Sequence, residues 1–159
     1  TPVATKVQVP LVREHTDVPN IAAGGITDGM TMAAAFALGA EGVQMGTRMV
    51  SALESPVHDN WKQAIVDAAE TDTLFLNQRH SPALRAIRTE RSESLVDAEH
   101  NVFSDFGDAQ KLYFGGDMNA ALALGGQVMG RIDEIRPVAD IIADTVREFA
   151  ETVDRLAVD

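Results

Sequence analysis

Two short peptides in the first third of the chain place glycine directly after a predicted strand. Gly24-Gly25 follows one apolar segment, and Gly46-Thr47 follows the next. Glycine allows backbone N–H groups to approach a phosphate closely, and a threonine hydroxyl can donate a hydrogen bond to a phosphate oxygen. The residue types and their positions therefore predict a phosphate-binding site at these two peptides.

Each peptide taken alone has a simpler interpretation. A tight turn between a strand and a helix often needs glycine, because glycine adopts positive φ angles without strain. The first peptide reads GGITDG, which is not the GxGxxG pattern of dinucleotide-binding proteins. The occurrence of both peptides, one strand-helix-strand unit apart, favours a shared phosphate ligand.

The elements around these peptides predict a β-α-β unit. Residues 19–23 and 42–45 are short apolar runs without polar alternation, which is typical of parallel strands buried on both faces. The segment between them is rich in Ala and Met at helical spacing, with Thr27 as the expected N-cap and Gly39 as the expected C′ residue. The sequence thus predicts an α/β fold with a parallel sheet.

The rest of the chain is predicted to be mostly helical. A short helix is expected before the first strand, with Pro10 in its first turn. Further elements are expected at residues 57–69 (helix), 71–77 (strand), 81–88 (helix begun by Ser81-Pro82), 119–129 (small-residue helix) and from Pro137 onward (long amphipathic helix), with a polar connection at 89–107.

Three arginines, Arg79, Arg85 and Arg88, are close together in an otherwise acidic chain. They could bind an anionic substrate or cofactor. Ion pairs with the acidic surroundings are the preferred interpretation, because the chain offers many carboxylates.

Composition limits the class of protein. The chain has 159 residues, of which 45% are apolar, and its formal net charge is −11. That charge argues against nucleic-acid or anionic-membrane binding, and no apolar run approaches the roughly 20 residues of a membrane span. The chain has no cysteine, which excludes disulfides and Cys-ligated metals and favours a cytoplasmic enzyme; no metal site is predicted.

The segments IAAGGITDG and GVQMGTRM resemble the C-terminal half of the nitronate monooxygenase (2-nitropropane dioxygenase) family. The segments ETDTLFL, PALRAIR and GGDMNAALALGGQVMGRIDEI extend the similarity over essentially the whole chain. That family, with the related FMN-dependent enoyl-acyl-carrier-protein reductases, consists of FMN-binding (β/α)8 barrels. The resemblance implies that residues 1–70 end such a barrel, with its last two strands, and that residues 71–159 form a mostly helical region packed against the barrel and active site.

The resemblance also implies roles for particular residues. The backbone after strand seven and the end of strand eight would hold the FMN phosphate, while a glycine-glutamine pair would lie near the flavin ring and substrate. The cofactor-binding residues would be Ala23, Gly24, Gly25, Gln44, Gly46 and Thr47, and the substrate-side residues Gly126 and Gln127.

The family's catalytic histidine belongs to a Gly-rich motif on an earlier strand, so we expect it upstream of Thr1. The histidines of this chain, at positions 15, 58, 80 and 100, are not in that context and are expected to be surface or capping residues, with only His80 kept open. The first six strands are also absent, so the chain is expected to be a fragment, a cleavage product or a split-gene subunit. Its expected partner is the N-terminal half of the barrel, since two strands alone would leave open edges.

Three functions follow as hypotheses. The first is an FMN-dependent monooxygenase that oxidises alkyl nitronates with O₂. The second is an NAD(P)H-dependent FMN reductase of enoyl thioesters or quinones. The third is a catalytically silent half-barrel that acts as a partner subunit.

Overall fold

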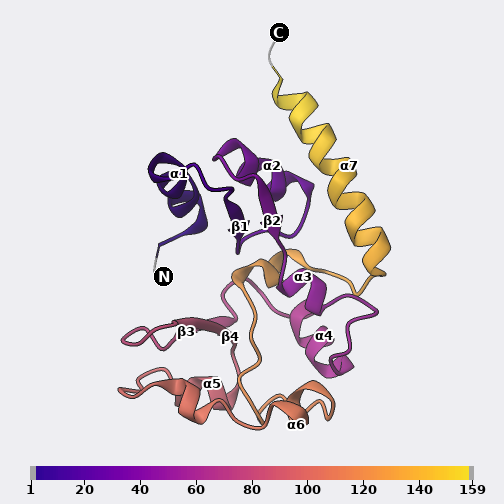
Figure 1. The fold of residues 1–159 in the computed structure, drawn as a ribbon. Coiled ribbons are helices and arrows are strands. Elements are labelled where there is room, and N and C mark those ends of the chain that lie inside the picture. Colours follow the sequence, from indigo (N-terminus) through magenta and orange to yellow (C-terminus); the bar gives the residue numbers. More distant parts are fainter. Residues whose placement is uncertain (1–2, 158–159) are drawn as a thin grey trace.

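The protein has an α/β fold in which a β-α-β unit and a long C-terminal helix lie beside a second group of short elements (Figure 1). The computed structural model describes residues 3–157. Its helices are α1 (Thr5–His15), α2 (Gly29–Ala37), α3 (Thr47–Val50), α4 (Asp59–Val66), α5 (Glu90–Ser94), α6 (Ala109–Tyr113) and α7 (Val138–Leu156), with 3-10 turns η1 (Val102–Asp105) and η2 (Gln127–Arg131). Its strands are β1 (Ile21–Ala23), β2 (Gly42–Gln44), β3 (Thr73–Leu76) and β4 (Leu84–Ile87).

The predicted β-α-β unit is confirmed. Strands β1 and β2 pair in parallel, with Ala23 opposite Gln44, and α2 connects them. A small core lies under this unit, where Val9 of α1 packs with Ala22, Ile26 and Ala35. Because parallel strands run in the same direction, the two glycine-bearing strand ends lie at one edge of the sheet.

Helix α1 begins earlier than the sequence predicted. It starts at Thr5, so Pro10 lies inside the helix and not in its first turn. Proline removes one backbone hydrogen bond there. The packing of Val9 into the core under β1 explains why the helix extends upstream in spite of that loss.

The start of α2 also differs from the prediction. Asp28, not Thr27, is the N-cap: its carboxylate accepts from the backbone N–H of Thr31 at 2.8 Å, and the Thr31 hydroxyl accepts from the backbone N–H of Asp28 at 3.2 Å. This reciprocal pair satisfies two of the N–H groups that a helix start leaves open. The predicted end is confirmed, since Gly39 follows the C-cap at a φ of 98°.

The predicted helix at residues 81–88 is wrong. Residues Leu84–Ile87 form β4, which pairs antiparallel with β3 from Thr73↔Ile87 to Leu76↔Leu84. The predicted helix at 119–129 is also wrong. Residues 121–125 are extended along the far side of β4, where the N–H of Ile87 donates to the carbonyl of Ala123 at 2.8 Å. Backbone pairing across the chain overrides the local helix signals in both segments.

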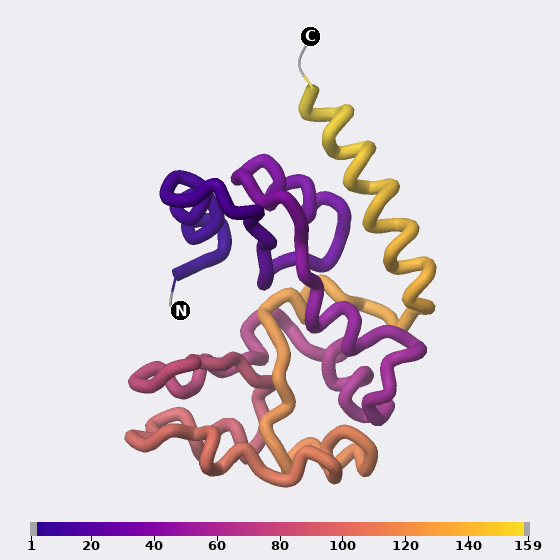
Figure 2. The backbone as a smooth tube through the Cα atoms, viewed as in Figure 1, coloured from indigo at the N-terminus to yellow at the C-terminus, as the bar shows by residue number. Residues whose placement is uncertain are grey.

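Helix α7 begins after Pro137, as predicted, and returns the chain to the β-α-β unit. Figure 2 shows the path of the chain toward α7: it rises from the second group of elements to the base of the β-α-β unit. Helix α7 itself then runs beside α2. Phe149 packs edge-to-face on Phe36 of α2, with ring centroids 5.1 Å apart. The predicted apolar stripe is divided, because Ile141 is buried while Val146 is 58% exposed.

Among residues 3–157, no helix is both long and apolar enough to cross a membrane.

The second group of elements has its own core, built around the fully buried side chains of Trp61, Ile65, Leu112 and Met129.

The contact between α2 and α7 at Gly29 generates the first prediction. A Cβ at Gly29 would lie 2.2 Å from the backbone nitrogen of Phe149 and 2.4 Å from the carbonyl oxygen of Thr145. Gly29→Ala should therefore lower the free energy of unfolding by about 1–3 kcal/mol, because the helices must separate. Denaturant unfolding measures this, with Gly46→Ala as the matched control, since a Cβ at Gly46 meets nothing within 4 Å. Equal effects of the two substitutions would contradict the packing argument.

Candidate functional site

The first predicted peptide forms a turn that needs glycine. Gly24 and Gly25 have φ angles of 88° and 81°. This left-handed region is strained for residues that carry a side chain. The hydroxyl of Thr5 donates to the carbonyl of Ala23 at 3.2 Å and covers one side of the turn. A Cβ built on Gly25 meets nothing within 4 Å. The backbone at Gly25 is therefore open to a ligand as well as conformationally constrained.

The second peptide is open for a different reason. Gly46 is the N-cap of α3 with a φ of −94°, which any residue can adopt, and a Cβ there also meets nothing within 4 Å. The hydroxyl oxygen of Thr47 accepts a hydrogen bond from the backbone N–H of Gly126 at 2.9 Å. Its own proton can still be donated to a ligand oxygen, because a hydroxyl is both donor and acceptor.

A cavity of about 700 Å³ brings together residues that lie between Val3 and Val128 in the chain. Four of the predicted residues line it: Gly24 and Gly25 after β1, and Gly126 and Gln127 at the start of η2. The remaining four, Ala23, Gln44, Gly46 and Thr47, do not line this cavity. Thr47 touches its wall through the hydrogen bond to Gly126, and Gln44 is paired with Ala23 in the parallel sheet.

The hairpin formed by β3 and β4 supplies lining residues that the sequence did not assign to the site. Phe75 of β3, Gln78 of the connecting loop and Arg85 of β4 face the cavity, together with Lys6 of α1. Nothing local to these residues indicates that they meet the glycines after β1. The one available signal was the occurrence of arginines in an acidic chain.

The arginine group behaves as predicted at two of its three members. Arg79 pairs with Glu99 at 3.2 Å and Arg88 with Glu93 at 3.1 Å. Arg85 does not pair with a carboxylate among the described residues. Its guanidinium donates to the hydroxyl of Thr73 at 3.0 Å and lies 5.3 Å from the centre of the Phe75 ring.

None of the histidines at positions 15, 58, 80 and 100 lines this cavity. His58 caps α4, where its ring nitrogen accepts from the N–H of Asn60 at 3.1 Å. His15 contacts the carbonyl of Leu11 at 2.8 Å, and His80 contacts the carbonyl of Glu99 at 2.9 Å. Within the described part of the chain, no group of three His, Asp or Glu side chains is arranged to hold a metal ion.

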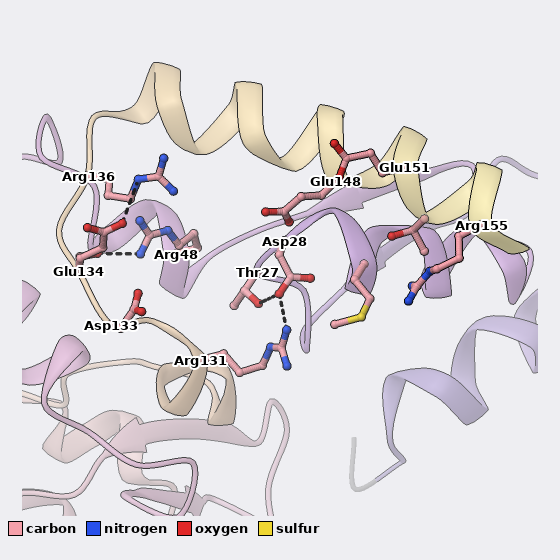
Figure 3. Close-up of a pocket in the computed structure, with 12 residues that line it drawn as sticks. Thr27, Asp28, Arg48, Arg131, Asp133, Glu134, Arg136, Glu148, Glu151 and Arg155 are labelled. Carbon is pink, nitrogen blue, oxygen red and sulfur yellow. Dashed lines mark hydrogen bonds and ion pairs between the residues drawn. The ribbon is translucent and has the colours of Figure 1, made fainter.

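A second, polar cavity of about 630 Å³ lies between α7, the start of α2 and the segment after η2 (Figure 3). Arg131 pairs with Asp28 at 2.5 Å, and the buried Arg48 donates to the carbonyl of Glu134 at 2.9 Å. The carboxylate of Glu148 accepts from the N–H of Gly29 at 3.2 Å, at the positive end of α2. These bonds attach α7 and the segment after η2 to the β-α-β unit.

Burial and neighbouring charges shift the pKa values of this second cavity. Burial alone would raise the pKa of Asp28, but the hydrogen bonds from Arg131 and Thr31 outweigh it and hold that pKa below the ordinary aspartate value. Burial lowers the pKa of Arg48, and the neighbouring Arg136 lowers it further. The cavity is therefore a network of fixed charges of both signs.

The fold and the site define an α/β protein with a cavity beside the glycine turn at the carboxyl end of a parallel strand, β1. The sequence profile described as nitronate monooxygenase matches residues 3–148. The chain therefore belongs to the nitronate monooxygenase family, a family of oxidoreductase enzymes.

Individual relatives agree with this assignment. A probable nitronate monooxygenase of Staphylococcus haemolyticus is 35% identical over 100 residues, which cover 63% of this chain and 28% of the relative. The structure of FabK from Thermotoga maritima aligns with a TM-score of 0.89 and 41% identity, covering 98% of this chain and 52% of FabK. A nitroalkane oxidase from Streptomyces ansochromogenes shares the fold, with a TM-score of 0.77 at 24% identity over 98% of this chain and 46% of that one. The chain thus spans about half the length of these solved relatives.

The lowered pKa of Asp28 generates the second prediction. In the unfolded state the Asp28 carboxylate takes up a proton near its ordinary pKa of 3.8, whereas in the folded state its pKa is lower. The stability that Asp28 contributes is therefore fully present above the ordinary aspartate pKa and is lost as the pH falls through the lower folded value. Urea unfolding between about pH 3 and pH 6 should show a shallower loss of stability for Asp28→Asn than for the wild type.

Arg131→Met provides the matched control for this prediction, since it removes the ion-pair partner and leaves the carboxylate. It should also flatten the pH dependence. Parallel loss of stability in all three proteins would contradict the assigned cause.

Proposed function

We propose that this chain forms the last two strands of an FMN-binding (β/α)8 barrel and that it holds the FMN phosphate. The phosphate would be bound by backbone N–H groups at Gly24, Gly25 and Gly46 and by the hydroxyl of Thr47. The observation that carries this proposal is the pair of open glycine positions at the ends of adjacent parallel strands. Membership of the nitronate monooxygenase family supports it.

The described residues fit such a cofactor. No side chain occupies the space beside Gly25 or Gly46, and the hydroxyl proton of Thr47 is free for a phosphate oxygen. The adjoining cavity has apolar walls at Ile26 and Leu38, which suit a planar aromatic ring. Gly126 and Gln127 line the same cavity, which supports their proposed place on the substrate side.

The proposed reaction is the oxidation of an alkyl nitronate by O₂, for which the bound flavin would supply the redox chemistry. This chain would contribute binding and orientation of the cofactor. The base that removes a proton from the substrate would be a histidine of the N-terminal half of the barrel, which is the proposed partner of this chain. None of the histidines at positions 15, 58, 80 and 100 lines the cavity.

A second reaction has support of its own. The identity with FabK is 41% over 98% of this chain, hairpin included, whereas the probable nitronate monooxygenase of Staphylococcus haemolyticus aligns with 63% of it. An NAD(P)H-dependent reduction of an enoyl thioester or quinone on the same flavin is therefore the alternative. A cytoplasmic location is proposed for either reaction because the chain has no cysteine.

The third prediction tests the phosphate site. Gly46→Val places a branched side chain in space that is empty, at a φ that valine tolerates, so folding should be preserved. The dissociation constant of FMN should rise about tenfold or more, which corresponds to the loss of one charge-assisted hydrogen bond. Fluorescence titration of the flavin measures this, with Ala37→Val on the exposed face of α2 as the control. FMN affinity that is the same in the two variants would exclude the assigned site.

The fourth prediction separates the two reactions. In anaerobic stopped-flow experiments with the full protein, a nitronate should bleach the flavin absorbance rapidly, and NADH should do so slowly. Rapid bleaching by NADH with none by the nitronate would replace the first reaction with the second. A protein that binds no flavin under any condition would leave the silent partner subunit as the surviving function.

A further inference from the structure

Arg85 differs from the two arginines that flank it in sequence. Arg79 and Arg88 each pair with a glutamate at the surface, whereas no carboxylate of residues 3–157 forms an ion pair with Arg85. Its guanidinium is held by the Thr73 hydroxyl at 3.0 Å and by the face of the Phe75 ring at 5.3 Å. These contacts fix the position of the guanidinium without neutralising its charge.

The charge of the cavity wall is opposite to that of the chain. Arg85 and Lys6 both line the cavity of about 700 Å³, and none of the described residues that line it is acidic. The chain as a whole carries a formal net charge of −11. A cavity with two cations and low-polarity walls concentrates field lines and attracts anions.

The shape of the guanidinium and the walls restrict the class of anion. Arginine presents parallel N–H donors that match two oxygens on one atom. The walls at Ala35 and Val128 are apolar. A small organic anion with a planar two-oxygen head and an apolar body satisfies both features.

We infer that Arg85 binds the anionic head of the substrate in this cavity. The inference rests on the proposed function, in which the substrate is an alkyl nitronate, whose two oxygens are attached to one nitrogen. The nitronate head would accept two N–H bonds from the guanidinium, and its alkyl part would lie against the apolar wall. Arg85 is then a residue that sets specificity for the anionic form over the neutral nitroalkane.

The position of Arg85 argues for the substrate and against the cofactor phosphate. The phosphate has its own donors at the strand ends, whereas Arg85 comes from β4 of the hairpin. The carbonyl of Arg85 accepts from the N–H of Gly125 at 3.2 Å, directly before Gly126-Gln127. The arginine is therefore attached to the part of the wall that is proposed to face the substrate. Lys6 is exposed on α1 and adds long-range attraction.

Anion binding and specificity can be measured in the full protein with its flavin, and this gives the fifth prediction. Calorimetric titration with benzoate, an inert carboxylate with an apolar body, should show binding that Arg85→Met weakens about tenfold or more. The KM for propyl nitronate should rise by a similar factor, while the KM for neutral 1-nitropropane and the dissociation constant of FMN change less than about threefold. Arg85→Lys should fall between the wild type and Arg85→Met, because it keeps the charge and loses the paired donors.

Arg79→Met is the matched control, since it removes an equal charge from the same hairpin outside the cavity. It should leave the dissociation constant of benzoate and the KM for propyl nitronate unchanged. Equal effects of Arg79→Met and Arg85→Met would overturn the inference, as would weaker FMN binding in Arg85→Met with unchanged benzoate binding. Failure of benzoate to bind the wild type would also overturn it, whatever reaction the protein catalyses. If the wild type binds benzoate through Arg85 and oxidises no nitronate, the proposed reaction fails and the anion site stands.

Discussion

The close contact of α2 with α7 at Gly29 determines the path of the chain between them. The chain leaves the β-α-β unit after β2, and α7 brings it back along α2 from Val138, so residues 47–137 are fastened at both ends to the same unit. Three interactions secure the return: the helix backbones meet at Gly29, Phe149 packs on Phe36, and Glu148 binds the start of α2. The aromatic pair contributes about 0.5–1.5 kcal/mol beyond burial and the carboxylate at the helix start about 0.3–1 kcal/mol. Neither is large alone, but both act where the two helices already touch.

A second connection, from Thr47 to Gly126, brings the returning segment to the strand ends. Residues 121–125 run along β4, so the position of Gly126 depends on the hairpin as well as on Thr47. The cavity is consequently built from distant peptides between Val3 and Val128, with the two glycines after β1, the hairpin side chains and Gly126-Gln127 among its parts. The second cavity has the opposite character. Arg131, Arg48 and Arg136 already bind Asp28, the carbonyl of Glu134 and Asp144, so these charges attach α7 and the segment after η2 to the β-α-β unit.

The sequence predicted those parts of the fold whose causes are local. The β-α-β unit was predictable because its strands, its alanine-rich helix and Gly39 are consecutive in the chain. The N-cap was misplaced by one residue because Thr27 and Asp28 are both good caps, and the side chain of Thr31 decides between them. The start signal at Ser81-Pro82 was followed by a strand because its partners, β3 and Ala123, lie elsewhere in the sequence. Ala121, Leu122 and Ala123 indicate a helix by propensity, yet they are buried as an extended segment.

The candidate site shows the same division. Gly24, Gly25, Gly126 and Gln127 were assigned from sequence, and the cavity contains them, but Lys6, Phe75, Gln78 and Arg85 enter it only through tertiary packing. Arg85 could not be separated from Arg79 and Arg88 by sequence, since all three have the same charge and similar surroundings in the chain.

The distribution of exposed apolar side chains supports the barrel proposal independently of the cavity. Large apolar residues are exposed on both flanks of the β-α-β unit, at Val7 and Leu11 of α1 and at Ile142 and Val146 of α7. In a (β/α)8 barrel each β/α unit is flanked by two others, so these are the two surfaces that neighbouring units would cover. The carboxyl end of β1 is already covered, because residues of the hairpin and η2 line the cavity beside Gly24 and Gly25. These flanks are where the proposed N-terminal half of the barrel, with its catalytic base, would dock.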